Sequence, residues 1–179
     1  MTVIAGAVTA SVNVKNSDDD NIETARVLVK AATGGPFPFN VTLNAGAITR
    51  SGSTATVSHT GHGMATNDKV LIEGANEVEY NGIFTITKIN NDSYSYTVSG
   101  TPGTPATGTI KSTFVVLSGL TDASGNITMS RVFPSDQPIT GWARKSSVDD
   151  PPLYKQSAIG GLVDSETGFS ANVLLILDN

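Results

Sequence analysis

Apolar and polar residues alternate along three short segments in the middle of the chain, residues 69–73, 82–89 and 93–99. This period of two is typical of half-buried β-strands. The residues between these segments are rich in Gly, Asn and Asp, which suit tight turns. We therefore predict a strand meander or small β-barrel, and we place this module at residues 45–112.

The two flanks alternate in the same way, and we interpret them as one domain that the module interrupts. The predicted strands of the flanks cover residues 8–14, 25–31, 113–117, 126–131, 139–145, 154–159 and 170–177. Turns recur at roughly the 8 to 12 residue spacing of a β-sandwich, and no window carries a convincing helical stripe. The predicted fold class is all-β, with a discontinuous sandwich formed by residues 21–44 and 113–179.

Residues 1–20 are predicted to form an extended N-terminal arm, because the alternating segment is followed by an acidic loop that separates it from the sandwich. Within the arm, the candidate interface residues are Val8, Val12 and Val14.

Two further sets of apolar residues are candidates for contacts. Phe37 and Phe39, held extended by neighbouring prolines, are either an apolar tab for a neighbouring subunit or packing at the junction of the two units. Trp142, the single tryptophan, is expected to anchor the sandwich core, with burial in an interface as the alternative.

The composition of the chain disfavours or excludes several classes of function. The chain has 179 residues, 39% of them hydrophobic and only 15% charged, and its net charge of −5 disfavours binding to nucleic acid. It has no cysteine, which excludes disulfides and thiolate metal sites. No run approaches the ~20 apolar residues of a membrane span, and residues 1–15 show neither the basic start nor the continuous apolar core that a secretion signal would have. We expect a soluble product of the cytoplasm without membrane contact.

Candidate chemistry is sparse. His59 and His62, with Asp68 nearby, offer too few ligands for a zinc site, and a structural role is favoured. The acidic segment 17–23 lacks the order of a calcium loop, so a solvated loop is favoured over a calcium site. No Gly-x-Ser-x-Gly segment occurs. A glycosidase that uses two distant acids stays open. We predict a protein that is not an enzyme and has no cofactor, no catalytic residue and no metal ligand.

The central module resembles a β module that recurs in virion proteins of tailed phages and prophages, and it is similar to the small FCCH β-barrel of ubiquitin-activating enzymes. The resemblance rests on the following residues: His62, Gly63, Asp68, Val70, Ile72, Gly74, Ala75, Tyr80, Asn81, Gly82, Phe84, Tyr96, Val98, Ser99, Gly100 and Pro102.

The flanks resemble Ig-like sandwiches of the transthyretin or carboxypeptidase-regulatory type. The turn Gly-Leu-Thr-Asp-Ala-Ser-Gly at residues 119–125 carries this resemblance, because Asp122 can bond the backbone ahead of it and Gly125 can adopt a positive φ. Patterns familiar from phage proteins follow at residues 138–146, 154–155 and 174–178.

Together the resemblances imply a structural protein of the virion, assembled in the bacterial cytoplasm. The expected role is that of a capsid decoration or cement protein that binds the major capsid protein or other virion proteins and copies of itself. One alternative is a component of a tail or head fibre whose inserted module binds a receptor or glycan. A small hydrolase acting on envelope sugar is a third hypothesis.

Overall fold

The computed structural model describes residues 6–145 and 154–177. Every long element in these ranges is a β-strand, and the single helical element is a short 3-10 turn, η1 (Val78–Tyr80). The predicted all-β sandwich class is confirmed. The chain divides into two compact units, unit 1 (Met1–Pro36 and Val116–Asn179) and unit 2 (Phe37–Val115).

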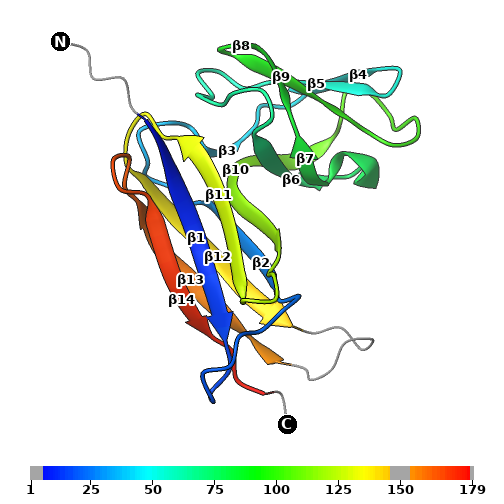
Figure 1. Cartoon of the computed structure of the whole chain (residues 1–179). Coiled ribbons are helices and arrows are strands. Elements are labelled where there is room, and N and C mark those ends of the chain that lie inside the picture. The colour runs from blue at the N-terminus through cyan, green and yellow to red at the C-terminus, as the bar shows by residue number, and fades with distance from the viewer. Residues whose placement is uncertain (1–5, 146–153, 178–179) are drawn as a thin grey trace, which may run out of the picture. The chain divides into compact units, whose positions relative to one another are not determined.

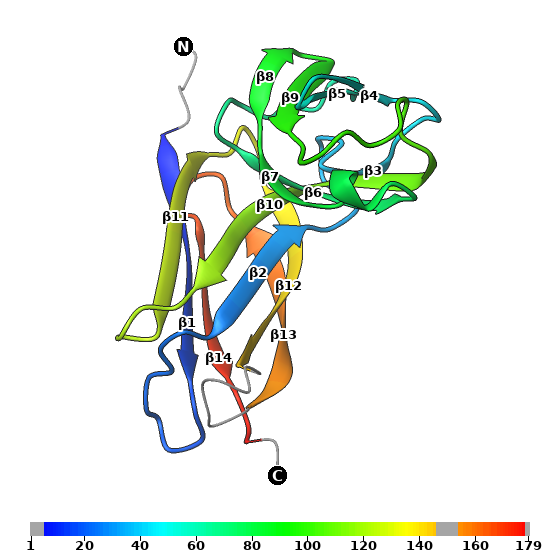
Figure 2. The same cartoon turned by 90° about the vertical axis from the view of Figure 1, so that its right-hand side faces the viewer.

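Unit 1 is a sandwich of two sheets (Figures 1 and 2). One sheet has three strands in the order β11-β1-β14, and in the other the strands run in the order β13-β12-β2-β10. The strands are β1 (Ala7–Lys15), β2 (Arg26–Ala31), β10 (Gly108–Leu120), β11 (Asn126–Val132), β12 (Gln137–Lys145), β13 (Tyr154–Val163) and β14 (Phe169–Leu174). Strand β10 crosses the boundary, and its residues 116–120 belong to unit 1.

The core of unit 1 is aliphatic and follows directly from the alternation in its strands. In β2, Val27, Val29 and Ala31 are buried, as the period of two requires. The other strands of the same sheet contribute the buried side chains Val116, Ile139, Ala143, Ile159 and Val163, and β14 of the facing sheet contributes Val173.

The N-terminal arm was a wrong prediction. Strand β1 is the central strand of the three-stranded sheet, antiparallel to β11 and parallel to β14. Val8, Val12 and Val14 are at most 8% exposed and lie in the core of unit 1. They alternate because one face of β1 packs inside the sandwich, so they are not available as interface residues; residues 1–5 lie outside the described ranges.

The predicted turn at residues 119–125 is confirmed in its detail. The Asp122 carboxylate accepts hydrogen bonds from the backbone N–H groups of Ser124 and Asn126, each at 2.9 Å. Gly125 has φ +71°, and a Cβ at this position would lie 2.6 Å from the carbonyl oxygen of Val14. This close approach explains why glycine ends the turn. Of the patterns that follow it, Ser146 and Asp178 lie outside the described residues.

Unit 2 consists of two sheets. A four-stranded sheet has the order β4-β5-β9-β8, and the second contains β7, β6 and residues 108–115 of β10, with β3 also paired to β10. The strands are β3 (Asn40–Thr42), β4 (Ile48–Ser51), β5 (Thr54–Ser58), β6 (Lys69–Ala75), β7 (Gly82–Thr85), β8 (Thr87–Asn90) and β9 (Ser93–Thr97).

The predicted closed barrel is absent from the described residues, since the strands of unit 2 form separate sheets with free edges. The rings of Phe84, on β7, and Tyr96, on β9, stack with centroids 4.2 Å apart, so the two sheets pack face to face. The unit boundaries at 36/37 and 115/116 differ from the predicted limits of 45 and 112, because β3 and residues 108–115 of β10 pair with each other inside unit 2.

Candidate functional site

The two histidines that the sequence singled out lie together in unit 2 and are buried. Their ring centroids are 5.8 Å apart, and each ring also packs near the ring of Tyr94. His62 is fully buried, its Nδ1 accepts a hydrogen bond from the N–H of Met64, and its Nε2 therefore carries the proton and donates to the carbonyl of Asn90 at 2.9 Å. His62 thus has both ring nitrogens engaged with the backbone.

His59 is held differently. Its Nε2 lies 2.8 Å from the carbonyl oxygen of Pro38, an acceptor, so this nitrogen carries the proton and donates. Its Nδ1 is buried and has no hydrogen-bond partner. Burial lowers the pKa of His59 below its ordinary value and His62 lowers it further, whereas the bond to Pro38 opposes the shift. His59 is therefore a neutral imidazole with one free acceptor nitrogen.

Asp68 does not join the histidines as a ligand. Its carboxylate accepts a hydrogen bond from the N–H of Ala65 at 2.6 Å and so organises the turn before β6. Among the residues that the structure describes, no group of three or more His, Asp or Glu side chains is placed to hold a metal ion.

The acidic segment 17–23 forms a turn that its own side chains and their neighbours organise. The Asn16 side-chain oxygen accepts hydrogen bonds from the backbone N–H groups of Asp18 and Asp20. The Lys15 ammonium group pairs with the Asp19 carboxylate at 2.9 Å. These hydrogen bonds and this ion pair stabilise the local turn.

The aromatic candidates Phe37 and Phe39 belong to the interior of unit 2. Phe39 is 1% exposed and packs against Phe114, with centroids 4.8 Å apart. Phe37 is half-buried, stacks on Phe39 and covers Gly63, where a Cβ would lie 2.5 Å from its ring. Both rings are used for packing within the unit, which leaves little of them for a neighbouring subunit.

Trp142 lies on the outward face of the four-stranded sheet of unit 1, which corrects its predicted place in the core. Its neighbours along β12, Ile139 and Ala143, fill the buried face, and Trp142 is half-buried on the other. The guanidinium carbon of Arg144 stands 4.6 Å from the centre of the indole ring, a cation–π contact.

The outward residues around the indole include a set of apolar side chains, which we call the Trp142 face, and Arg26, Lys30, Thr140 and Arg144 lie among them on the same side of the sheet. In the register of the sheet, Trp142 lies opposite Leu28 on one side and Ala158 on the other, and Pro138 lies opposite Leu162. Leu162 is 47% exposed. The Trp142 face comprises Pro138, Trp142, Ala158, Leu162 and the buried Leu28, which is 8% exposed. Sequence reasoning missed it because the alternation of β12 does not show which of its two apolar faces is inside.

Comparison with protein-family models finds no match to this chain, and comparison with curated proteins finds none either. Within the described residues, no helix has the length and apolar character needed to cross a membrane.

Proposed function

We propose that this protein is a non-enzymatic structural protein of a tailed-phage virion, most specifically a capsid decoration or cement protein. Two kinds of support underlie the proposal. The sequence of unit 2 resembles a recurrent virion module, and the two histidines, the obvious candidates for chemistry, are built into packing and backbone hydrogen bonds. A protein that acts by binding to the surface of a capsid needs a face that attaches it there. We propose that unit 1 provides this face.

The Trp142 face is the observation that carries the proposal. Tryptophan and arginine are the residue types most enriched at energetically dominant positions of protein interfaces. Here an Arg144 guanidinium already covers the indole ring, which holds both side chains in place before a partner arrives. Exposed Leu162 and the small outward Ala158 extend the apolar area without obstructing it.

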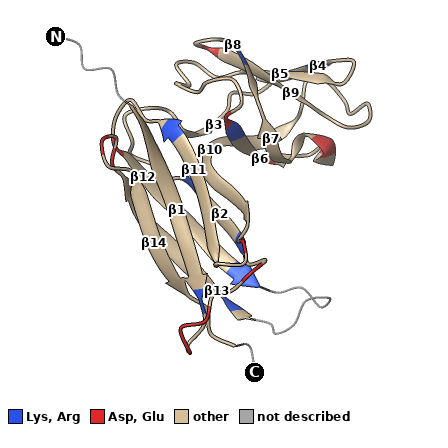
Figure 3. Ribbon diagram, in the orientation of Figure 1, with Lys and Arg blue, Asp and Glu red and all other residues tan. Residues whose placement is uncertain are grey.

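The charges of unit 1 suit docking on this face. In the described strands of unit 1, the charged residues are all Lys or Arg, and the Asp and Glu residues that the structure describes in this unit lie in the loops (Figure 3). The centres of interfaces are poor in charged residues, and a rim of one sign sets orientation. We therefore propose that the partner, a major capsid protein or another virion protein, presents an apolar patch with carboxylate or carbonyl oxygens facing Arg144.

Incorporation into particles tests the proposal. Wild-type and Trp142→Ala chains are expressed during phage assembly, and the copy number in purified virions is measured by quantitative mass spectrometry. We expect hundreds of copies of the wild type and a drop of about tenfold or more for Trp142→Ala, since the loss of a central aromatic residue costs about 2 kcal/mol or more.

The matched control is Thr128→Ala, an exposed position on β11 in the other sheet of unit 1, which should incorporate like the wild type. Unfolding midpoints of all three chains show whether each is folded. Absence of the wild-type chain from virions, or equal incorporation of a folded Trp142→Ala chain, would contradict the proposal. A few copies per particle would favour the fibre alternative instead.

A further inference from the structure

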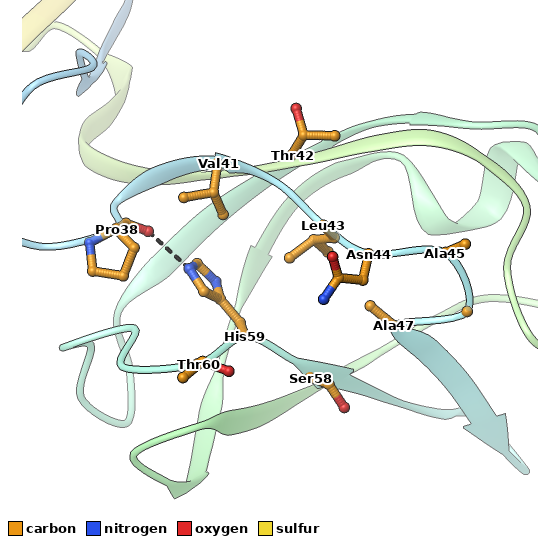
Figure 4. Close-up of a pocket in the computed structure, with 11 residues that line it drawn as sticks. Pro38, Val41, Thr42, Leu43, Asn44, Ala45, Ala47, Ser58, His59 and Thr60 are labelled. Atoms are coloured by element: carbon orange, nitrogen blue, oxygen red, sulfur yellow. Dashed lines mark hydrogen bonds between the residues drawn. The ribbon is translucent and has the colours of Figure 1, made fainter.

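We infer that unit 2 carries a binding pocket for a neutral, hydroxyl-bearing small molecule, of the chemical class of an uncharged pyranose sugar. The pocket has a volume of about 390 Å³, within the range of small-molecule sites. It lies between the segment that contains β3 and the loop after it, residues 38–47, and the end of β5 with the residues after it, 58–60 (Figure 4). The inference is independent of where the protein is assembled.

His59 supplies the polar anchor of the pocket. Figure 4 shows its imidazole between Pro38 on one side and Leu43 and Asn44 on the other. The hydrogen bond to Pro38 fixes the proton on Nε2 and leaves Nδ1 as an acceptor without a partner, in a side chain that is 96% buried. A buried polar atom without a partner is costly; because Nδ1 has almost no accessible surface in the free chain, a ligand hydroxyl donates to it only when the adjoining pocket residues shift to admit it.

The rim of the pocket supplies further hydrogen-bonding groups. Thr42, Asn44, Ser58 and Thr60 are exposed, and their side chains make no hydrogen bond to any other described residue. Three hydroxyl groups and one amide, each able to donate and accept, match the alternating donors and acceptors of a polyol.

The floor and the charge of the pocket define the ligand class further. Leu43 and Ala47 are buried beneath the rim and offer an apolar surface to the C–H face of a sugar ring. None of the eleven lining residues is Asp, Glu, Lys or Arg. A charged ligand would lose hydration without gaining a counter-charge, so the pocket selects a neutral one.

NMR titration of the full chain tests the inference. Amide spectra are recorded with glucose, galactose and N-acetylglucosamine as probes, and with glucuronic acid as the charged comparison. We expect saturable shifts from at least one neutral sugar, centred on residues 41–47 and 58–60, and weaker binding of glucuronic acid. Asn44→Ala and His59→Phe should each weaken the affinity, by about tenfold for His59→Phe.

The control variant is Thr49→Ala, which lies on β4 outside the pocket and is also exposed. It should bind the same sugar as the wild type does. Asn44→Ala removes only an exposed side chain, so it keeps the test valid if His59→Phe fails to fold. No saturable shift with any neutral sugar, equal binding of glucuronic acid, or undiminished binding by folded Asn44→Ala and His59→Phe chains would overturn the inference.

Discussion

Both units are β-sandwiches, but they bury different types of side chain. Unit 1 buries mainly aliphatic side chains on alternate positions of long strands such as β1 and β12. Unit 2 buries two histidines and the tyrosines Tyr80, Tyr94 and Tyr96, whose polar atoms need partners. Aliphatic packing depends on volume alone, whereas a polar interior depends on every hydrogen bond being made.

The largest expected effect is in the aliphatic unit. Val14→Asp places a carboxylate at a fully buried position of the central strand β1, and it should lower the free energy of unfolding of unit 1 by at least about 4 kcal/mol. Trp142 is the single tryptophan and lies in unit 1, so its fluorescence in a urea titration reports this unit.

Ala7→Asp is the matched control, because Ala7 is exposed on the same strand. It should change stability by no more than about 0.5 kcal/mol. If both variants behaved alike, β1 would be an arm outside the sandwich after all.

The next largest effect is in the polar interior of unit 2. The Tyr94 hydroxyl lies 2.7 Å from the Ser112 hydroxyl in a buried pair. Burial raises the pKa of Tyr94, so the hydroxyl stays protonated. Tyr94→Phe leaves Ser112 without this partner and should cost about 1–3 kcal/mol, measured by hydrogen exchange of the amides of β5 and β9.

The double variant Tyr94→Phe with Ser112→Ala sharpens this test, since removing both partners leaves no buried hydroxyl unsatisfied. It should be more stable than Tyr94→Phe alone. If the stability losses of Tyr94→Phe and Ser112→Ala simply added in the double variant, the hydrogen bond would contribute nothing of its own. Unit 2 would then be stabilised by the packing of side-chain volume, as unit 1 is.

A smaller effect is expected from pH, and it should be larger in unit 2 than in unit 1. Because the folded pKa of His59 lies below its ordinary value of 6.5, the unfolded chain binds the extra proton. The stabilisation is fully present above pH 6.5 and is lost as the pH falls from there toward the folded pKa. One proton limits the slope to about 1.4 kcal/mol per pH unit.

Hydrogen exchange of unit 2 between pH 7.5 and 5, corrected for intrinsic exchange rates, measures this slope. A His59→Phe chain should lose most of it, and the Trp142 fluorescence midpoint of unit 1 should change less. An unchanged slope in folded His59→Phe would assign the pH dependence to other groups.

The positions of strands and turns were predictable from the sequence, whereas the pairing of one strand with another was not. The alternation located β1, β2 and β12 almost to the residue, and the turn residues Asp122 and Gly125 act as their types predict. The same alternation could not show that β1 pairs with β11, more than a hundred residues later. An amphipathic strand looks identical as a free arm and as the centre of a sheet.

The features of the candidate sites that the sequence did not predict also depend on contacts that local patterns do not show. Strands β3, β4 and β5 are short and rich in Ser, Thr and Asn, so their pattern was too weak to predict them. Trp142 sits on an outer face because Ile139 and Ala143, on alternate positions of the same strand, take the buried face. The Nδ1 of His59 is an acceptor because Nε2 donates to the carbonyl of Pro38, twenty-one positions earlier. No local pattern in the sequence shows a contact over this distance.

The most direct test of the central claim, that unit 1 attaches through the Trp142 face, is hydrogen–deuterium exchange of the chain free in solution and bound in purified virions. We expect slower exchange in the bound state for residues 26–31, 137–145 and 154–163, with the exposed loop residues 122–124 of unit 1 unchanged. Equal exchange of these strands in the two states, or protection confined to other surfaces, would contradict the account.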